Sequence, residues 1–522
     1  MKREGERYVA ASPSLISLAG RLRQHLGVLR WGNADLGSRL VLLLFGVTAL
    51  TAARTASFIG QVPPDSLEPR FPPLIWLFHQ ADALFLPGVN HLPGQTPIAY
   101  IQFVALALAL VCFFLAARAT IPVLLKRHYR PLAAFALPVA GLLLILNVQG
   151  VLPYFRVVGT PTHYGNDAVS VTSCAIDLFL HGENPYTDFR VVPCLSKYFD
   201  PSMVAIKSTP LQAGAFKHRR IYPSSGQLVT QFHTAQRRQE ACPPEFECHF
   251  SYPAASFLLP AAFVALHIHD LSIFYLACYL GIVALVVRRS SGAARRVALI
   301  AIIANAALWP TISTGDTDAL YALLVLLAWV WRDQRWLSAL AFGLAVATRQ
   351  QAWFYLFFYA VLVARTMGRR ELLIRLGIVG GVFVALNLPY FLASPGSWLV
   401  GVLGPMRDLM FPLGTGLIAL SIHGKGSLPL GTRGLYGVFE AIALGASLWY
   451  YWQTCRKHPG TGLILAPVAL FFAWRSLYSY FLPLSLLVLY PALVWHREPT
   501  DPLTVDSNED GGEIGARQTV AA

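Results

Sequence analysis

The chain has 522 residues, of which 55% are hydrophobic and only 13% are charged, and its formal net charge is +14. A soluble domain averages about 25% charged residues, so this composition excludes an ordinary soluble globular protein. Nucleic-acid binding is disfavoured as well, because Lys and Arg form short clusters between apolar runs and do not line one soluble face. We expect an all-α, polytopic integral membrane protein with about 11–13 transmembrane helices.

Apolar runs recur along the whole chain. A helix of about 18 or more apolar residues can cross the hydrocarbon core of a bilayer. The backbone must be helical there, because no water is present to satisfy its polar groups. In chain order, the expected spans occupy residues 40–59, 98–117, 131–152, 251–287, 297–312, 319–331, 336–348, 353–364, 376–392, 435–452, 463–474 and 477–495.

Residues 251–287 form one long apolar run that is interrupted at residues 267–270. The interruption predicts two helices. Two full crossings would place the basic residues 288–296 outside, against the preference of Lys and Arg for cytoplasmic loops. Either one half lies flat or re-enters the membrane, or this basic cluster breaks the preference, and the sequence leaves both alternatives open.

The orientation of the other spans follows from the Lys and Arg residues of the short loops, which favour the cytoplasm. Two large polar loops, residues 153–250 and 394–433, then lie on the outer side of the membrane. The basic segments that this orientation assigns to the cytoplasm are residues 1–39, 126–130, 288–296, 365–375 and 456–457.

Four regions follow from this orientation. A cytoplasmic N-terminal tail covers residues 1–39, and two N-terminal membrane spans lie within residues 40–130. The main membrane module covers residues 131–496 and includes the extracytoplasmic loop 153–250. The polar, acidic segment 497–522 is expected to be a disordered cytoplasmic tail.

Four cysteines, Cys174, Cys194, Cys242 and Cys248, fall in the large outer loop. Four cysteines in one exported loop predict two disulfides in an oxidising space. The pairs Cys174–Cys194 and Cys242–Cys248 are the simplest by proximity, although three connectivities are possible and free thiols are the alternative. A zinc site is disfavoured because the spacing lacks paired CxxC motifs.

Asp167 follows the third span and stands close to His163 in the sequence. It leads into an amphipathic stretch, residues 168–180, that is followed by a polar turn ending at Tyr186. An acid at the mouth of a membrane helix is either a solvated loop charge or a general base at the water–lipid boundary. We place Asp167 as the candidate base, with His163 and Tyr186 as candidate substrate contacts.

Three further turns on the predicted outer side carry charged residues. Asp316 and Asp318 occupy a short turn between two apolar runs, where they either form a tight turn or bind sugar hydroxyls or a divalent cation. Arg349 and Arg475 each end an apolar run on the same side. An arginine there either extends its side chain to the membrane surface or grips a phosphate group with its planar fork.

The order of these elements resembles the GT-C superfamily of membrane glycosyltransferases, and within it the polyprenyl-phosphate-mannose-dependent mannosyltransferases. The matching pieces are Asp167 with the HGENPY stretch ending at Tyr186, SYP at 251–253 with Pro260, TGD at 314–316, RDQRW at 332–336, residues 343–349, NLP at 387–389 and SPGSW at 394–398. The resemblance implies that Asp167 is the catalytic base and that Arg349 binds the phosphate of the lipid donor, together with Arg475.

The function that we expect is the transfer of one sugar from a polyprenyl-phosphate donor to a glycan or lipid acceptor on the extracytoplasmic face of a bacterial inner membrane. Membrane lipids are expected partners and nucleic acid is not. The one cofactor that the acids Asp316 and Asp318 suggest is a divalent cation. Two alternatives remain from the sequence: a lipid or sugar transporter or flippase, and a non-catalytic partner in envelope assembly.

Overall fold

The computed structural model describes residues 34–59, 95–155, 164, 166–198, 210–219, 222–423 and 433–494, and this part of the chain is mostly helical. The first half contains α2 (Ala34–Ile59), α5 (Gln95–Ala117), α6 (Val123–Phe155), α7 (Asp167–Leu180), α8 (Pro185–Asp188), α9 (Val191–Tyr198), η1 (Gly214–Phe216), α10 (Ser225–Arg237), α11 (Ala255–Ala265), α12 (Leu271–Arg289), α13 (Gly292–Ile303) and α14 (Leu308–Thr314). The second half contains α15 (Asp318–Val330), α16 (Arg335–Val346), α17 (Gln351–Thr366), α18 (Arg369–Ala393), α19 (Pro395–Arg407), β1 (Leu413–Gly414), α20 (Leu417–His423), α21 (Arg433–Thr454), η2 (Pro459–Thr461), α22 (Gly462–Leu465), α23 (Val468–Phe471), β2 (Arg475–Ser476), η3 (Tyr478–Tyr480), α24 (Leu484–Leu487) and α25 (Leu489–Leu493).

Five of the described helices are long and apolar enough to cross a membrane. The expected number of about a dozen crossings stays a prediction, since several expected spans form shorter helices. The five candidate segments are Ala34–Ser57, Ile98–Ala117, Val123–Ile145, Leu271–Arg289 and Arg369–Ala393.

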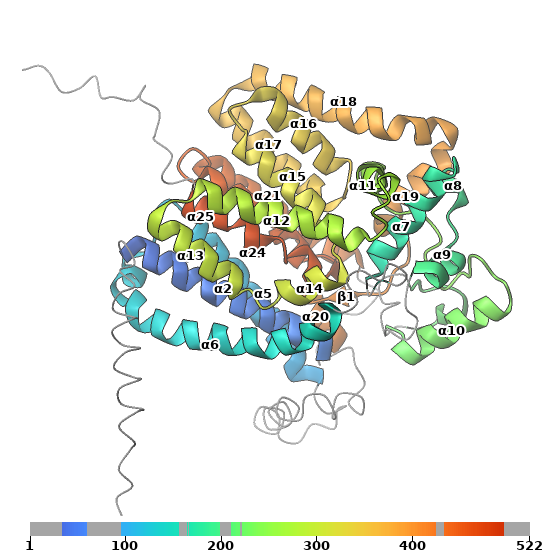
Figure 1. Ribbon diagram of the computed structural model, residues 1–522, viewed down its shortest axis with the longest axis horizontal. Helices are drawn as coiled ribbons and strands as arrows, with labels where there is room; N and C mark the ends of the chain where they lie inside the picture. Colours follow the sequence, from blue (N-terminus) through green and yellow to red (C-terminus); the bar gives the residue numbers. More distant parts are fainter. Residues whose placement is uncertain are drawn as a thin grey trace, which may run out of the picture.

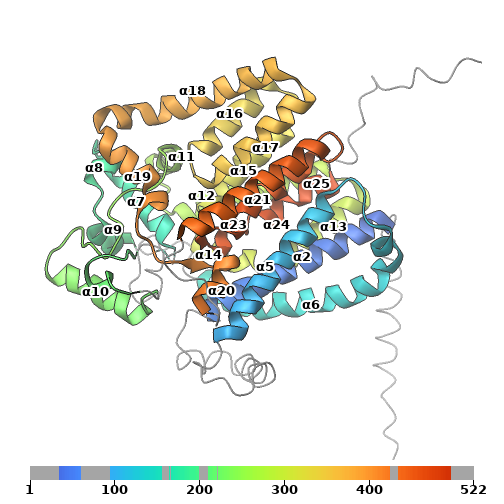
Figure 2. The same ribbon diagram turned by 180° about the vertical axis from the view of Figure 1, so that it is seen from behind.

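The N-terminal helices α2 and α5 are part of the main bundle. They pack on each other, and α2 also contacts α6, α13 and α24 while α5 contacts α20, α22 and α25. At the start of α2, Asp35 forms ion pairs with Arg39 at 2.8 Å and with Lys126 of α6 at 2.9 Å. The two expected N-terminal spans therefore share one core with the module that follows them. Figure 2 shows α5 and α21 on the same face of the bundle.

The apolar run 251–287 is divided as the sequence predicts, into α11 and α12 with a break at residues 266–270. Helix α11 has 11 residues, which span only about 16 Å at 1.5 Å per residue. That is too short to cross a hydrocarbon core of about 30 Å. Of the two alternatives, the structure favours the one in which the first half does not cross.

Two predictions about helix limits differ from the structure: one concerns the expected span 297–312, the other the basic cluster 126–130. Residues 297–312 are broken at residues 304–307, between α13 and α14. The basic cluster 126–130, expected in a loop, lies inside α6 because Val123 to Phe155 form one helix. Helix α6 continues through this cluster although Pro131 follows Arg130, and an interior proline removes one backbone hydrogen bond of the helix.

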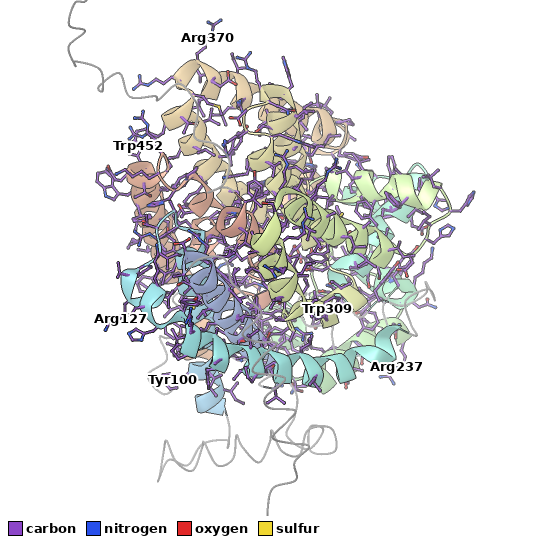
Figure 3. The ribbon with its side chains drawn as sticks, turned by 60° about the vertical axis from the view of Figure 1, so that its left-hand side comes forward. Tyr100, Arg127, Arg237, Trp309, Arg370 and Trp452 are labelled. Atoms are coloured by element: carbon purple, nitrogen blue, oxygen red, sulfur yellow. A yellow bond between two sulfur atoms is a disulfide. The ribbon has the colours of Figure 1, made fainter. Side chains whose placement is uncertain are left out.

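The basic clusters and the large polar loop lie at different ends of the bundle. Arg456 Nε donates a hydrogen bond to the Arg365 carbonyl at 2.9 Å, so two clusters that were assigned to the cytoplasm meet. In Figure 3, Arg127 and Arg370 lie on one side of the molecule and Arg237 of α10 lies on the other. Figure 1 shows α7 to α10 gathered at one end, where α18 leads into α19. The side of a membrane that each end would face stays a prediction.

The C-terminal apolar segment forms the centre of the core. The expected spans 463–474 and 477–495 form short helices, η2 to α25, separated by turns. Leu482, Leu484 and Leu487 have no exposed surface. Between α23 and η3, β2 pairs in parallel with β1, with Arg475 opposite Leu413 and Ser476 opposite Gly414. This pairing fixes the backbone of Arg475.

Candidate functional site

One cavity of about 420 Å³ collects most of the charged residues singled out in the sequence. The start of α7, the turn before α15, the turn before α17, and β2 with η3 all contribute to its wall, and α21 closes a further side. Five of the predicted site residues line it: Asp167, Asp316, Asp318, Arg349 and Arg475. Residues that are far apart in the sequence therefore share one enclosed space.

Asp167 is placed by the cap of α7. Asn166 is the N-cap residue; its side-chain oxygen accepts a hydrogen bond from the Ala168 N–H at 2.9 Å, and its Nδ2 donates to the Gly315 carbonyl at 3.0 Å. The cap therefore ties the start of α7 to the turn that carries Asp316. Burial raises the pKa of the Asp167 carboxyl above its ordinary value, while the Ala168 N–H and the charges of Arg475 and Arg349 oppose that rise.

Arg349 lies in the wall of the cavity as half of a buried ion pair. Its Nε and Nη2 lie 3.0 and 2.9 Å from Asp318 Oδ1, and Nη2 also donates to Thr317 Oγ1. The guanidinium centre lies 4.0 Å from the centroid of the Tyr252 ring, a cation–π contact. The Arg349 charge is balanced inside the protein by Asp318, which holds two of its three guanidinium nitrogens.

Asp316 is held by neighbours of a different kind. Its Oδ2 accepts a hydrogen bond from the Tyr279 hydroxyl, and its Oδ1 accepts one from the Asp318 N–H at 3.1 Å. The preceding Gly315 has a φ of 76°, and a Cβ there would lie 3.1 Å from Val169 Cγ2. Only glycine allows this turn to approach α7 closely. No group of three or more His, Cys, Asp or Glu that could hold a metal occurs in the described part of the chain.

Arg475 and Arg433 bring positive charge to the same cavity. Arg433, at the start of α21, donates to the carbonyls of Asp408 at 2.6 Å and Met406 at 2.7 Å. Arg433 and Arg475 are close enough for their charges to repel each other. Like charges held together at a cavity wall favour an anionic ligand. Of the two arginines that were predicted, Arg475 acts more strongly on Asp167 than Arg349 does.

Tyr186 lies outside the cavity and supports it indirectly. It is buried, with 4% of its surface exposed, and its hydroxyl donates to the Tyr252 carbonyl at 2.8 Å. Tyr252 in turn lies against Arg349. His163 lies outside the described residues.

The loop cysteines form one disulfide in the structure, between Cys242 and Cys248, whose Cα atoms are 5.5 Å apart. Cys174 and Cys194 are thiols that contact each other between α7 and α9. The predicted proximity of this second pair is therefore seen, but the bond is not.

Glu247 and Arg433 also line the cavity and were not singled out from the sequence. Glu247 stands between the two cysteines of the disulfide, in the segment CPPEFEC. Burial raises the pKa of Glu247 to about 8, and the negative charge of Asp408 adds to the rise. The one available signal was an acid inside a short cysteine loop, which by itself indicates no function.

The cavity lining includes one strongly exposed apolar side chain, Met406, at 54%. Leu409 and Val438, next to the lining residues Met410 and Gly437 in the sequence, are 62% and 52% exposed. Polar groups in the lining with apolar side chains near them suit a ligand with a charged head and a hydrocarbon tail. Comparisons with protein-family models, with curated proteins and with solved structures find no match to this chain.

Proposed function

We propose that this protein is a multi-pass membrane glycosyltransferase that moves a sugar from a polyprenyl phosphate to an acceptor hydroxyl on the outer face of a bacterial inner membrane. The observation that carries the proposal is that Asp167, Arg475 and Arg433 share one cavity of about 420 Å³ whose lining includes the exposed apolar side chain of Met406. A carboxylate for the acceptor, positive charge for a phosphate and an apolar entrance for a lipid are what this reaction requires.

In the proposed reaction, Asp167 takes the proton of the acceptor hydroxyl as the acceptor oxygen attacks the anomeric carbon. The bond between that carbon and the phosphate oxygen breaks, and the polyprenyl phosphate leaves with both electrons of the bond. Arg475, with Arg433 beside it, stabilises the negative charge that develops on the phosphate. One base and one leaving group describe a single displacement, which inverts the configuration at the anomeric carbon.

Arg349 has a supporting role in this proposal. The sequence made it the expected phosphate ligand, and its Nε and Nη2 are held by Asp318 and Thr317. We assign the first phosphate contact to Arg475 because its charge acts more strongly on Asp167 than that of Arg349 does, and we leave Arg349 to hold the Asp318 turn and the Tyr252 ring in place. The positive field of Arg349 still reaches Asp167 and helps to keep that carboxyl ionised.

The test compares Asp167→Asn with Asp177→Asn in purified protein in lipid nanodiscs, supplied with a polyprenyl-phosphate hexose pool and a membrane-glycan extract. Asp177 is on the same helix but outside the cavity lining, paired with Lys197 at 2.7 Å. We expect Asp167→Asn to lower the release of polyprenyl phosphate by about 100-fold or more, and Asp177→Asn to leave it unchanged. Because the Asp167 pKa is raised, activity should increase with pH through a value above the ordinary carboxyl range.

A second pair of variants tests the phosphate site. Arg475→Gln should weaken the binding of undecaprenyl phosphate at least tenfold, as expected when a charge-assisted contact is lost. Arg238→Gln, an exposed loop arginine, should not. Full transfer by Asp167→Asn would remove the base from the proposal. Flux of an intact lipid-linked sugar across liposomes, without chemical conversion, would replace the proposal with a transporter.

A further inference from the structure

Glu247, in the cavity lining, and Asp408, next to it, form an acid pair that the reaction above does not use. Glu247 lines the cavity and is 7% exposed, and Asp408 follows the end of α19. A Cβ placed on Gly404 would lie 3.1 Å from Glu247 Oε1 and 3.2 Å from Asp408 Oδ2. Both oxygens therefore lie close to the α19 backbone at Gly404, and a side chain at this position would crowd both of them.

Both of these oxygens are buried and lack a hydrogen-bond partner within the described residues. An unsatisfied buried carboxyl oxygen destabilises the folded protein unless a ligand completes its bonding. Ser251 hydrogen-bonds to the Glu247 carboxyl, so the side chain is anchored while Oε1 is left to the space beside Gly404. This combination is typical of a group that is positioned for a ligand.

The charges around the pair limit the kind of ligand. Arg475 of β2 and Asp167 of α7 both act on Glu247, and His249, Arg407 and Arg433 act on Asp408. The positive neighbours disfavour a bound cation, and the two carboxyl groups disfavour an anion. A neutral group that donates and accepts hydrogen bonds is the remaining fit.

We infer that Glu247 and Asp408 form a subsite for a neutral, hydroxyl-bearing ligand, the ring of a sugar, in the same cavity as Asp167. This inference rests on the proposed function and adds the place where a sugar ring is held. A hydroxyl group donates one hydrogen bond and accepts others, so it matches a pair in which one carboxyl carries a proton and the other is ionised.

The charges around Glu247 and Asp408 agree with one proton being shared by the two carboxyl groups. Burial, then the charge of Asp408, raise the pKa of Glu247 to about 8, so Glu247 carries its proton at neutral pH. Burial also raises the pKa of Asp408. As the pH rises through about 8, Glu247 ionises and its hydrogen-bond donor is lost. Sugar binding should therefore be present at pH 7 and weaken as the pH rises through about 8.

The test uses saturation-transfer NMR on the full-length protein in nanodiscs, with the methyl glycosides of mannose, glucose and galactose as probes. Wild type should transfer saturation to at least one probe. Glu247→Ala should weaken its binding at least tenfold, whereas Glu247→Gln, which still donates and accepts, should stay within about threefold. The wild-type signal should fall between pH 7 and pH 9, and the Glu247→Gln signal should not.

A second perturbation crowds both carboxyl groups without replacing either acid. Gly404→Ala should weaken glycoside binding, while Gly396→Ala, on the same helix with nothing within 4 Å of its Cβ position, should not. Undecaprenyl phosphate binding, measured on every variant, separates a failed subsite from a failed fold or a failed phosphate site. Absence of transfer to every probe in wild type, or equal signals in wild type and Glu247→Ala, would overturn the inference. Binding of Mn²⁺ that depends on Glu247 would overturn it in favour of a cation site.

Discussion

The buried pair of Arg349 and Asp318 allows a quantitative prediction. The two side chains are only 8% and 2% exposed, and the shortest contact between the charges is 2.9 Å. Asp318→Asn keeps the shape of the side chain but leaves the Arg349 charge buried without its counterion. Breaking a buried pair from one side costs roughly 3–5 kcal/mol of folding free energy. Removing both charges, in Asp318→Asn with Arg349→Gln, should cost clearly less than the sum of the two single variants.

The measurement is the thermal unfolding midpoint of detergent-solubilised protein, followed by loss of the monodisperse peak. For a chain of this length each kcal/mol shifts Tm by about 2 °C or less, so Asp318→Asn should lower Tm by several degrees. The matched control is Asp333→Asn, whose side chain is 75% exposed and lies 3.6 Å from Arg332; a pair of this kind contributes at most about 1 kcal/mol. Equal shifts for Asp318→Asn and Asp333→Asn, or a double variant that equals the sum, would refute the reasoning.

Two further predictions concern the supports of the cavity. Gly414→Ala should destabilise the protein by roughly 1–3 kcal/mol and weaken undecaprenyl phosphate binding. Gly414 has a φ of 146°, and a Cβ would clash with the Ser476 backbone next to Arg475. The control Gly445→Ala, with open space around its Cβ position, should be neutral or slightly stabilising in a Tm measurement. Cys242→Ser should lower the unfolding free energy by about 2 kcal/mol, the loop-closure value for so short a loop. It should also weaken the glycoside signal that depends on Glu247. A reductant should reproduce the Tm shift in wild type but leave the Tm of the variant unchanged.

The existence of the helices could be predicted from hydropathy, but their lengths could not. The runs at residues 40–59 and 98–117 have helical counterparts in α2 and α5. In a long apolar segment a helix satisfies every backbone polar group within the segment itself. Residues 463–495 are just as apolar, yet they form several short helices with turns between them. Their side chains lie at the centre of the bundle, where tertiary packing stabilises the turns between the short helices. Hydropathy alone does not show where such turns occur.

The site was predictable where a polar residue interrupts an apolar run. Asp167, Asp316 and Arg475 stand out for that reason, and the structure places all three in one cavity. Glu247 and Arg433 lie in polar sequence, where another charged residue carries no signal. Pairing was equally hidden: nothing in the sequence tells that Asp318, two residues after Asp316, neutralises Arg349, because that depends on how α15 and α17 approach each other.

The division of charges inside the cavity explains why the chain keeps more ionisable groups there than one reaction needs. Arg349 with Asp318, and Tyr279 with Asp316, satisfy each other and hold the turns between helices. Such internal pairs fix geometry because either partner alone would be a buried charge or an unsatisfied polar group. Asp167, Glu247 and Arg475 line the same space. Burial raises the pKa of both carboxyls; nearby arginines oppose the rise at Asp167, whereas the charge of Asp408 adds to it at Glu247. Two carboxyls in different charge environments and a guanidinium therefore lie in one cavity, and these are the groups that a phosphate-linked sugar and a hydroxyl acceptor require.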